Sequence, residues 1–353
     1  MPEAERQKLG LTRETWSLEV ISDPENPVRL GSPLTKEKGT ALDFDRLMEL
    51  AKTRAVRFPK VLTCLNRGQP LGMGLWEGVP MRDIVWLSQP RQTRRPVTLP
   101  RRISFYGYPS DDPAKAFRSS LPASRVFEDP PGLPPVTLCY KLNNQWLASE
   151  RGGPVRAVVP EAYGFKSIKW LTHLVVSNLF HANDTYANER GMNNDIDSPL
   201  KTFAGMLGIP PATKVGEPIP VTGYAQVGIS GLSKVQYWLH RDGTPEPSRD
   251  SHYAEAPWQD AELLSPPNDW GGGLPTGKIP TPTMGFDSET RMPDSWPMRF
   301  CKVHWAALLP GQIAGEYTLR CRTIDDKGYA QPMPRPFQKW GHSQIEERTI
   351  GVG

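Results

Sequence analysis

Cysteine is scarce in this chain, and its spacing excludes several kinds of site. The four cysteines are Cys64, Cys139, Cys301 and Cys321, and no two of them form a CxxC pair. A zinc ribbon or a thioredoxin-like redox motif is therefore not expected. Cys301 and Cys321 lie in segments with the alternating pattern of strands. The sequence is compatible both with two buried thiols and with a disulfide between them. The six histidines form no HxxxH or HxH pair, which argues against a histidine metal cage.

Long apolar runs are also missing. The longest, such as Leu174–Val176 and Trp305–Leu309, are far too short to cross a bilayer, so no membrane span is expected. The first six residues do not combine a basic stretch with an apolar one, so no secretory signal is visible. A GxSxG elbow is absent, and the glycines at 68, 72 and 74 lack the dinucleotide spacing.

The charge balance is close to neutral. The 42 Lys and Arg residues exceed the 38 Asp and Glu residues by four, and no motif that reads DNA or RNA accompanies them, so no nucleic-acid partner is expected. One basic cluster comprises Arg91, Arg94, Arg95, Arg101 and Arg102. It is either a solvated loop or a patch that attracts an anionic substrate or an acidic electron-transfer partner.

Proline, glycine and aromatic residues are plentiful. The 38 prolines and 31 glycines predict many turns, short strands and long connections. The 11 Trp, 10 Tyr and 11 Phe residues argue for a packed protein. A chain of 353 residues is longer than one compact core usually spans, so two domains are expected.

Residues 1–200 mix strands and short helices without a regular βαβ rhythm, which predicts an α+β domain. Asp43 precedes the apolar pattern of a short capped helix, and Met81 begins another. Val61–Cys64 indicates a buried strand that enters a Gly-rich loop, and Trp76–Pro80 indicates a turn. Asn143-Asn144 is typical of a hairpin turn. Further strands are expected at residues 16–20, 103–108, 136–142, 155–159 and 168–176.

Residues 201–353 have a different character. Strands are expected at residues 221–227, 234–239, 298–305 and 316–324, with no convincing helix among them, and this pattern predicts an antiparallel β-sandwich. Residues 245–297 are rich in Pro, Gly and Trp and have little periodicity. Because the segment is long for a loop, it is expected to be a surface excursion or an interface element.

Three sets of segments carry a specific signal. The first is LTCLNRG at residues 62–68 with LWEGVPMRD at residues 75–83. The second is GPVRAVVP at residues 153–160, running into YGFKSIKW at residues 163–170. The third comprises residues 221–225, 240–243 and 325–332. Together they resemble the sulfite oxidase-like family of molybdopterin-dependent oxidoreductases, over nearly all of the chain. The resemblance implies a sulfite-oxidase-type molybdopterin-binding domain over residues 1–200 and an immunoglobulin-like dimerisation domain over residues 201–353.

The resemblance implies that Cys64 is the thiolate that binds molybdenum, and that the cofactor is molybdenum-molybdopterin. A soft thiolate suits such a metal, and positive neighbours such as Arg67 keep a thiolate ionised. Taken alone, Cys64 would more often be a small core residue. By the same resemblance Arg67 is a predicted catalytic residue.

Four residues suit the phosphate of the pterin: Arg156, Lys166, Ser167 and Lys169. Arginine offers a fork of donors, lysine a point charge and serine a hydroxyl, while the Gly164 turn leaves backbone N–H groups free. The alternative is that both lysines are merely solvated at the start of a strand.

Four further residues are placed by resemblance alone. Family members have a tyrosine that faces the metal, and Tyr186 is the best positional match, with His181 as its rival. Asp111, together with Asp112, falls near a family loop that contacts the pterin. A packed surface tyrosine and a solvated Asp-Asp-Pro turn are the respective alternatives.

The sequence departs from the family pattern in several places. True sulfite oxidases carry an extra arginine in the turn that here is Gly228–Leu232, and a histidine where this chain has Arg151 or Gly152. A pocket for the sulfite anion is expected to have converging arginines. Because the extra arginine is missing here, the sequence is also compatible with a substrate other than sulfite. Family members usually carry an F-x-x-R-x-H-type segment upstream of the strand near Trp16, and often an export signal. A protein with such a signal is expected in the periplasm, and a protein without it in the cytoplasm.

These observations predict an oxidoreductase that transfers an oxygen atom to or from a small substrate. No heme-binding motif is present, so an external electron acceptor such as a cytochrome is expected, and the second domain implies a homodimer. One alternative is a sulfoxide-type reductase with the same cofactor. The other is a cofactor-free binding protein that kept the fold.

Overall fold

The computed structural model describes residues 2–65, 70–91, 99–108, 116–181, 199–246, 253–332 and 345–353. Its helices are α1 (Glu3–Lys8), α2 (Phe44–Arg54), α3 (Met81–Leu87), α4 (Ala123–Phe127), η2 (Ser149–Arg151) and η3 (Gly164–Lys166), the last two being 3₁₀ turns. None of these helices is long and apolar enough to cross a membrane.

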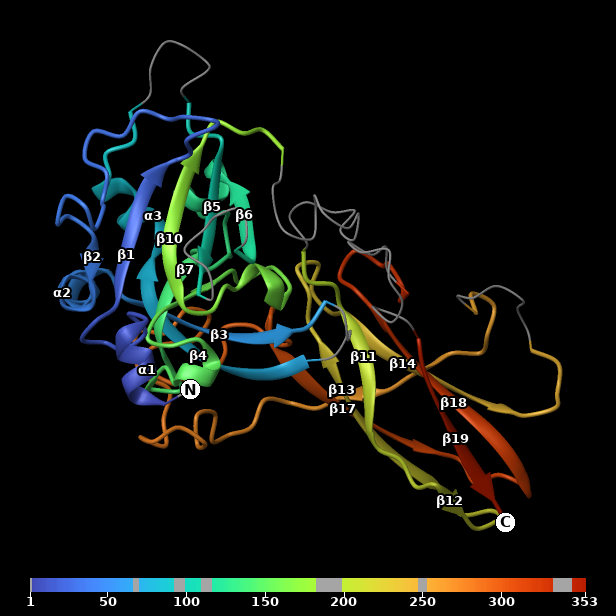
Figure 1. The fold of residues 1–353 in the computed structure, drawn as a ribbon. Helices are drawn as coiled ribbons and strands as arrows, with labels where there is room; N and C mark the ends of the chain where they lie inside the picture. The colour runs from blue at the N-terminus through green and yellow to red at the C-terminus, as the bar shows by residue number, and fades with distance from the viewer. Residues whose placement is uncertain are drawn as a thin grey trace.

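The strands of the first half form two sheets (Figure 1). One has the order β2-β1-β10-β5-β6, with β1 and β10 parallel. The other has the order β3-β4-β7-β8, with β9 paired to β7. The main apolar core, which includes Trp16, Leu47 and Phe105, lies between these sheets and helices α2, α3 and α4. The strands are β1 (Ser17–Ser22), β2 (Leu42–Asp43), β3 (Val56–Thr63), β4 (Pro70–Pro80), β5 (Arg102–Gly107), β6 (Arg118–Pro122), β7 (Thr137–Leu142), β8 (Gln145–Trp146), β9 (Arg156–Val158) and β10 (Leu171–Ser177).

Local chemistry accounts for several of these boundaries. The Asp43 carboxylate accepts a hydrogen bond from Arg46 N at 2.8 Å, so α2 begins at a capped N-terminus as predicted. Asn143 and Asn144 both have positive φ, which suits a tight turn between β7 and β8.

The prediction of a turn at Trp76–Pro80 is wrong. These residues are the last five of β4, which pairs with both β3 and β7. Gly78 is required there by a close approach of backbones, because a Cβ on it would lie 2.1 Å from Leu138 O. Glycine therefore marks a register shift between neighbouring strands at this point, not a turn.

The strands of the second half form two further sheets, which share one apolar core. Their orders are β11-β13-β17-β16 and β12-β19-β18-β14-β15, antiparallel except for β12 beside β19. Val221 and Trp305 from one sheet pack with Val235 and Leu319 from the other. The strands are β11 (Phe203–Gly208), β12 (Ala212–Thr213), β13 (Ile219–Gln226), β14 (Lys234–Arg241), β15 (Gln259–Asp260), β16 (Glu262–Leu263), β17 (Lys302–Leu309), β18 (Gly315–Ile324) and β19 (Glu346–Val352).

The Pro-rich excursion joins the two halves. In Figure 1 its orange coil passes below β3 and β4. Met284 N donates to Arg57 O at 2.8 Å, and Val61 N donates to Phe300 O at 2.7 Å, so the excursion covers the open edge of β3. Thr63 Oγ1 also donates to Gln226 Oε1 of β13. Of the two alternatives given by the sequence, the described part of this segment is an interface element.

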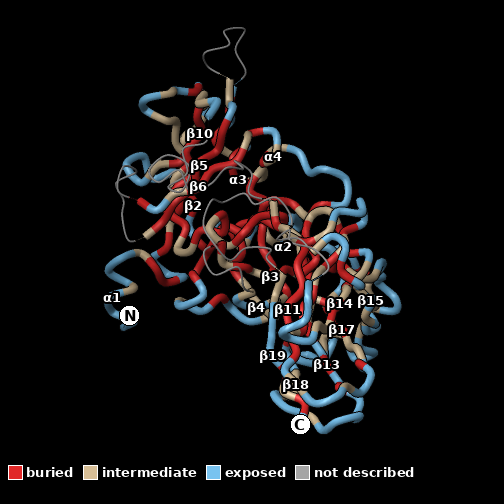
Figure 2. The backbone as a smooth tube through the Cα atoms, turned by 90° about the vertical axis from the view of Figure 1, so that its right-hand side faces the viewer, coloured by how far each residue is buried: buried red, intermediate tan, exposed pale blue. Residues whose placement is uncertain are grey.

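The buried parts of the chain follow from this arrangement. Figure 2 shows buried segments gathered in the first-half sheets and around β3 and β11, whereas the far end of the sandwich is mostly exposed. Cys139, Cys301 and Cys321 are completely buried, and all four cysteines are free thiols. The disulfide that the sequence left open between Cys301 and Cys321 is therefore not formed.

Replacing Trp305 by alanine should destabilise the sandwich by about 3–5 kcal/mol. The Trp305 side chain is completely buried, and its Nε1 donates to Tyr224 O at 3.1 Å. The measurement is the free energy of unfolding in urea. The matched control is His304→Ala, because the neighbouring His304 is exposed and should change stability by less than about 0.5 kcal/mol. Equal losses in both variants would contradict the packing described here.

Candidate functional site

A cleft of about 590 Å³ opens where the end of β3, the start of β4 and the segment around η3 come together. Segments far apart in the sequence therefore share one cavity, as expected for a ligand site. Its polar lining consists of Cys64, Tyr108, Asn143, Arg151, Arg156, Ser167 and Lys169. Its apolar lining includes Leu62, Leu65, Leu71, Met73, Trp76, Phe117, Leu142, Phe165, Ile168 and Trp170.

Cys64 is the cysteine of the chain that reaches this cleft. It follows β3 directly and is half-buried, whereas the other three cysteines have no exposed surface. Burial raises the pKa of the Cys301 thiol to about 12 and also raises the pKa of Cys139 and Cys321, so these three are inert. Exposure thus singles out the cysteine that the sequence predicted as metal ligand.

Arg156 forms the inner wall of the cleft and is 5% exposed. Its Nη2 donates to Ser167 O at 2.6 Å and its Nη1 to Arg151 O at 2.8 Å. Its guanidinium also lies 5.4 Å from the centre of the Trp76 ring. The Nε atom is buried and has no hydrogen-bond partner among the described residues. A buried donor without a partner is costly, so this atom indicates that a ligand completes the site.

Lys169 and Arg151 place two more cations in the same cleft. The pKa of Lys169 is lowered, first by burial and then by the like charges of Arg156 and Arg151. Burial also lowers the pKa of Arg156 to about 10, which leaves it charged at neutral pH. Cations that repel one another at the wall of a cleft favour a multivalent anion between them. The arrangement therefore fits the phosphate of a pterin cofactor.

The backbone beside these cations is held close to the end of β3. Ser167 Oγ accepts from Val159 N at 3.2 Å, which fixes the end of the η3 turn. A Cβ on Gly164 would lie 3.1 Å from Thr63 O, one residue before Cys64. The turn and the thiol are thus neighbours, and the residues present fit a group that carries a soft metal at one end and a phosphate at the other.

Lys166 does not line the cleft, although the sequence grouped it with Arg156, Ser167 and Lys169. Its side chain is completely buried, and its Nζ donates to Ser120 O of β6 at 2.8 Å. The 3₁₀ turn ends at Lys166 and the chain leaves it through Ser167, so Lys166 and Lys169 do not share one regular element and a K-S-I-K string does not deliver both lysines to one side.

The other predicted residues are distributed as follows. Arg67, Tyr186, Asp111 and Asp112 lie outside the described residues, so their roles remain predictions. His181, the rival of Tyr186, is exposed beyond the end of β10, with its ring 5.5 Å from that of Phe180.

Part of the basic cluster can be located. Arg91 and Arg101 are exposed, Arg102 is buried with its Nη1 donating to Ser120 Oγ at 3.2 Å, and Arg94 and Arg95 lie outside the described residues. None of the three described arginines lines the cleft. The structure therefore does not bring the described part of this cluster to the candidate site.

Lys60 is one of the residues near the site that sequence reasoning missed. It lies on β3 four residues before Cys64 and is completely buried. Its Nζ donates to Pro160 O at 2.6 Å and to Ala162 O at 2.9 Å. Burial lowers the pKa of Lys60 to about 7, against the opposing effect of Glu161. No sequence signal marks it, because a single lysine in a strand normally faces solvent.

Gly152 makes room for Lys169. It has φ of 99°, and a Cβ on it would lie 2.6 Å from Lys169 Cγ. The histidine that the family has near this position would therefore displace the lysine if it stood at residue 152.

We predict that Gly152→Ala costs more stability than Gly132→Ala. Both glycines have left-handed backbones, but a Cβ on Gly132 would meet nothing within 4 Å. Gly132→Ala should lose roughly 1 kcal/mol from the backbone alone, and Gly152→Ala at least about 1 kcal/mol more from the clash with Lys169. Urea unfolding of both variants measures the difference, and equal losses would show that Lys169 does not occupy that space.

Comparison with known proteins identifies the family of the domain that holds this cleft. A family model described as an oxidoreductase molybdopterin binding domain matches residues 9–184. Mitochondrial sulfite oxidase of Drosophila melanogaster is 29% identical over 137 residues, which cover 38% of this chain and 21% of the relative. Nitrate reductase [NADPH] of Pichia angusta is 31% identical over 105 residues, covering 30% of this chain and 11% of the relative. The matches thus span about a fifth or less of these two relatives.

A solved structure matches over a longer stretch. The sulfane dehydrogenase SoxCD from Paracoccus pantotrophus aligns with a TM-score of 0.62 at 15% identity, over 96% of this chain and 76% of that one. At this identity the likeness concerns the fold. With the matching family model, the related sulfite oxidases and a cleft suited to the cofactor, the chain belongs to the sulfite oxidase-like family of molybdopterin-dependent oxidoreductases.

Proposed function

We propose that this protein is an oxidoreductase that transfers an oxygen atom to or from a small substrate and exchanges electrons with an external partner such as a cytochrome. The observation that carries the proposal is the cleft in which the Cys64 thiol and the cations Arg156 and Lys169 occur together. When bound, a molybdenum-molybdopterin cofactor supplies two-electron redox chemistry. The chain's own residues bind it, orient it and shape the substrate space.

Each described residue has a distinct part in this proposal. Cys64 would bind the metal through its sulfur, as a soft ligand at the end of a rigid strand. Arg156 and Lys169 would hold the phosphate, with the unpaired Nε of Arg156 as one donor. Ser167 Oγ already accepts from Val159 N and keeps its own proton to donate. Arg67 and Tyr186 remain predicted catalytic residues, and Asp111 a predicted pterin contact.

The apolar lining near Cys64 bears on the substrate. Leu62, Leu65, Leu71, Met73 and Phe165 all line the cleft with the thiol. The described turn at Gly228–Leu232 has no arginine, and its Ile229 packs against apolar residues. An apolar wall favours an uncharged substrate beside the thiol, because an anion against Leu62, Leu65 or Phe165 would lose hydration, and the cations Arg156 and Lys169 are assigned to the phosphate. This supports the second candidate, a sulfoxide-type reductase with the same cofactor.

The sandwich of the second half is proposed to be the immunoglobulin-like dimerisation domain of a homodimer, with its boundary near residue 200. Supporting this, its first sheet and an adjacent loop expose Leu207, Leu308 and Ile313 by 60%, 68% and 61%. Exposed apolar side chains of this size are common in association surfaces.

Replacing Cys64 by serine should abolish stoichiometric molybdenum binding, because a hydroxyl is a poor substitute for a soft thiolate. The measurement is elemental analysis of the protein purified from a host that makes the cofactor. We expect near-stoichiometric metal in the wild type and a loss of at least about tenfold in Cys64→Ser, which corresponds to about 1.4 kcal/mol in binding. The control, Cys321→Ser, alters a buried cysteine in the core of the sandwich, away from the cleft. Equal metal in the wild type and Cys64→Ser would remove Cys64 from this role.

The loaded wild type should prefer uncharged sulfur substrates to sulfite. We expect kcat/KM for a small sulfoxide, measured with a reduced dye as electron donor, to exceed that for sulfite with an oxidised dye by at least about tenfold, or 1.4 kcal/mol in transition-state stabilisation. The physical reason is the apolar lining around Cys64. A clear preference for sulfite would instead favour the oxidase.

A further inference from the structure

One loop connects the two ends of the candidate site. It comprises residues 159–163, here called the approach loop, and it runs from the end of β9 to the η3 turn. Arg156 belongs to β9 just before this loop, and Ser167 and Lys169 stand just after it, so the loop links the cations on its two sides and contributes to their separation. Apart from Ala162 N, which donates to Val159 O at 3.3 Å, its backbone is held by partners from other elements.

Lys60 holds the approach loop from the side of β3. Its ammonium is completely buried and donates to the carbonyl oxygens of Pro160 and Ala162, at 2.6 and 2.9 Å. The two acceptors flank Glu161, so Lys60 holds the middle of the loop. A neutral amine still has two N–H groups for these two acceptors. The contact therefore survives loss of the proton, and its geometric role does not depend on the charge of Lys60.

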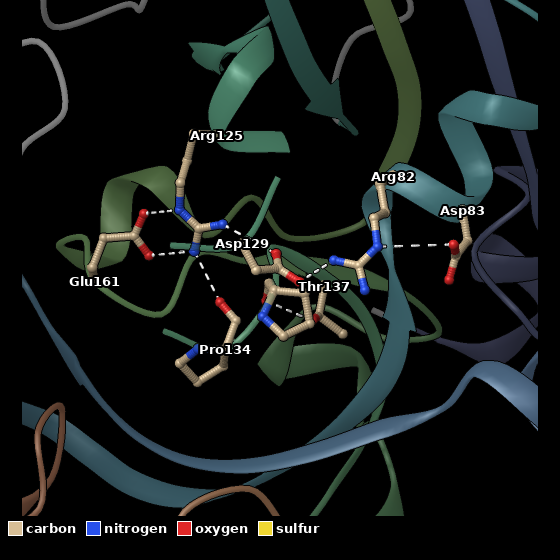
Figure 3. Close-up of polar contacts among 8 residues, drawn as sticks. Arg82, Asp83, Arg125, Asp129, Pro134, Thr137 and Glu161 are labelled. Carbon is tan, nitrogen blue, oxygen red and sulfur yellow. Dashed lines mark hydrogen bonds and ion pairs between the residues drawn. The ribbon is translucent and has the colours of Figure 1, made fainter. Parts of the chain in front are cut away.

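Arg125 also holds this loop, through the side chain of Glu161 (Figure 3). Its Nε and Nη2 donate to the two carboxylate oxygens of Glu161 at 2.6 and 3.0 Å, and Nη2 also donates to Pro134 O. Asp129 lies between Arg125 and Arg82 and contacts both. The approach loop is thus held at the carbonyl oxygens of Pro160 and Ala162 by a buried amine, and at the side chain of Glu161 by a charged network.

The strand that carries Lys60 also carries the thiol. Cys64 follows the end of β3, and Lys60 lies four residues before it on the same strand. Lys60 O accepts from Nε1 of Trp76, and the Trp76 ring packs against Arg156. One rigid strand therefore positions the sulfur directly and the phosphate-binding cations through the approach loop.

We propose that Lys60 is a positioning residue, which sets the separation between the Cys64 sulfur and the cations Arg156 and Lys169 so that one cofactor can span both. This inference rests on the proposed function, because it assumes that a pterin cofactor occupies the cleft. Lys60 itself does not line the cleft. Its ammonium reaches the site through Pro160 and Ala162, and its carbonyl oxygen accepts from Trp76. It acts through the backbone of other residues, which distinguishes it from a cofactor ligand.

The test replaces Lys60 by methionine, which keeps the length of the side chain and removes its donors. The matched control is Arg57→Met, because Arg57 is on the same strand but pairs with Glu77 and does not contact the approach loop. Each protein is purified from a host that makes the cofactor. The readouts are the melting temperature, the molybdenum and pterin contents per folded chain, and hydrogen exchange of residues 159–168.

For Lys60→Met we expect a folded protein with at least a fivefold loss of both molybdenum and pterin, and faster exchange confined to residues 159–168. Arg57→Met should keep the wild-type cofactor content. Wild-type cofactor content in Lys60→Met would overturn the proposal, and so would an equal loss in Arg57→Met, since that would reflect a general weakening of β3. If Lys60→Met does not fold, Lys60→Gln is tested in its place. Glutamine is too short to reach both carbonyls, so the same results for cofactor content would support or overturn the proposal.

The result also separates this inference from the proposed function. A wild-type protein without molybdenum or pterin would refute the function itself. A loaded wild type with an equally loaded Lys60→Met variant would refute only the positioning role.

Discussion

The open edge of strand β3 is the constraint on which the rest of this structure depends. One side of the strand pairs with β4, and the other is closed by Met284 and Phe300, which belong to the second half of the chain. Buried backbone groups without partners are costly, so β3 is complete only when the excursion lies against it. Because β3 ends at the thiol of the candidate site, the second half contributes to the site without lining the cleft.

Two groups of charged residues in the first half contrast in how their charges are compensated. In the network of Arg82, Asp129, Arg125 and Glu161, each guanidinium faces a carboxylate, as expected of a structural assembly. At the cleft the cations face one another, and burial and mutual repulsion lower the pKa of Lys169. A fold tolerates such an arrangement when a ligand supplies the missing charge. The distribution of charge therefore separates binding residues from scaffold residues.

The sequence was sufficient wherever a short pattern determines the outcome. The cap at Asp43 and the turn at Asn143-Asn144 follow from such patterns. The family resemblance placed Cys64, Arg156 and Lys169 in one site, and all three line the cleft. Sequence reasoning failed where the outcome depends on distant backbone. Gly78 serves a close approach to Leu138 instead of a turn, and Lys166 turns toward β6. Lys60 was not predicted because its acceptors lie 100 and 102 residues further along the chain.

The covered edge of β3 also has a consequence for biosynthesis. A ribosome releases Arg57 and Val61 long before Met284 and Phe300, so a nascent chain carries a half-paired strand with exposed donors and acceptors. Such an edge invites pairing with other chains. The edge of the strand that leads to Cys64 therefore stays open until the C-terminal half has emerged and can cover it.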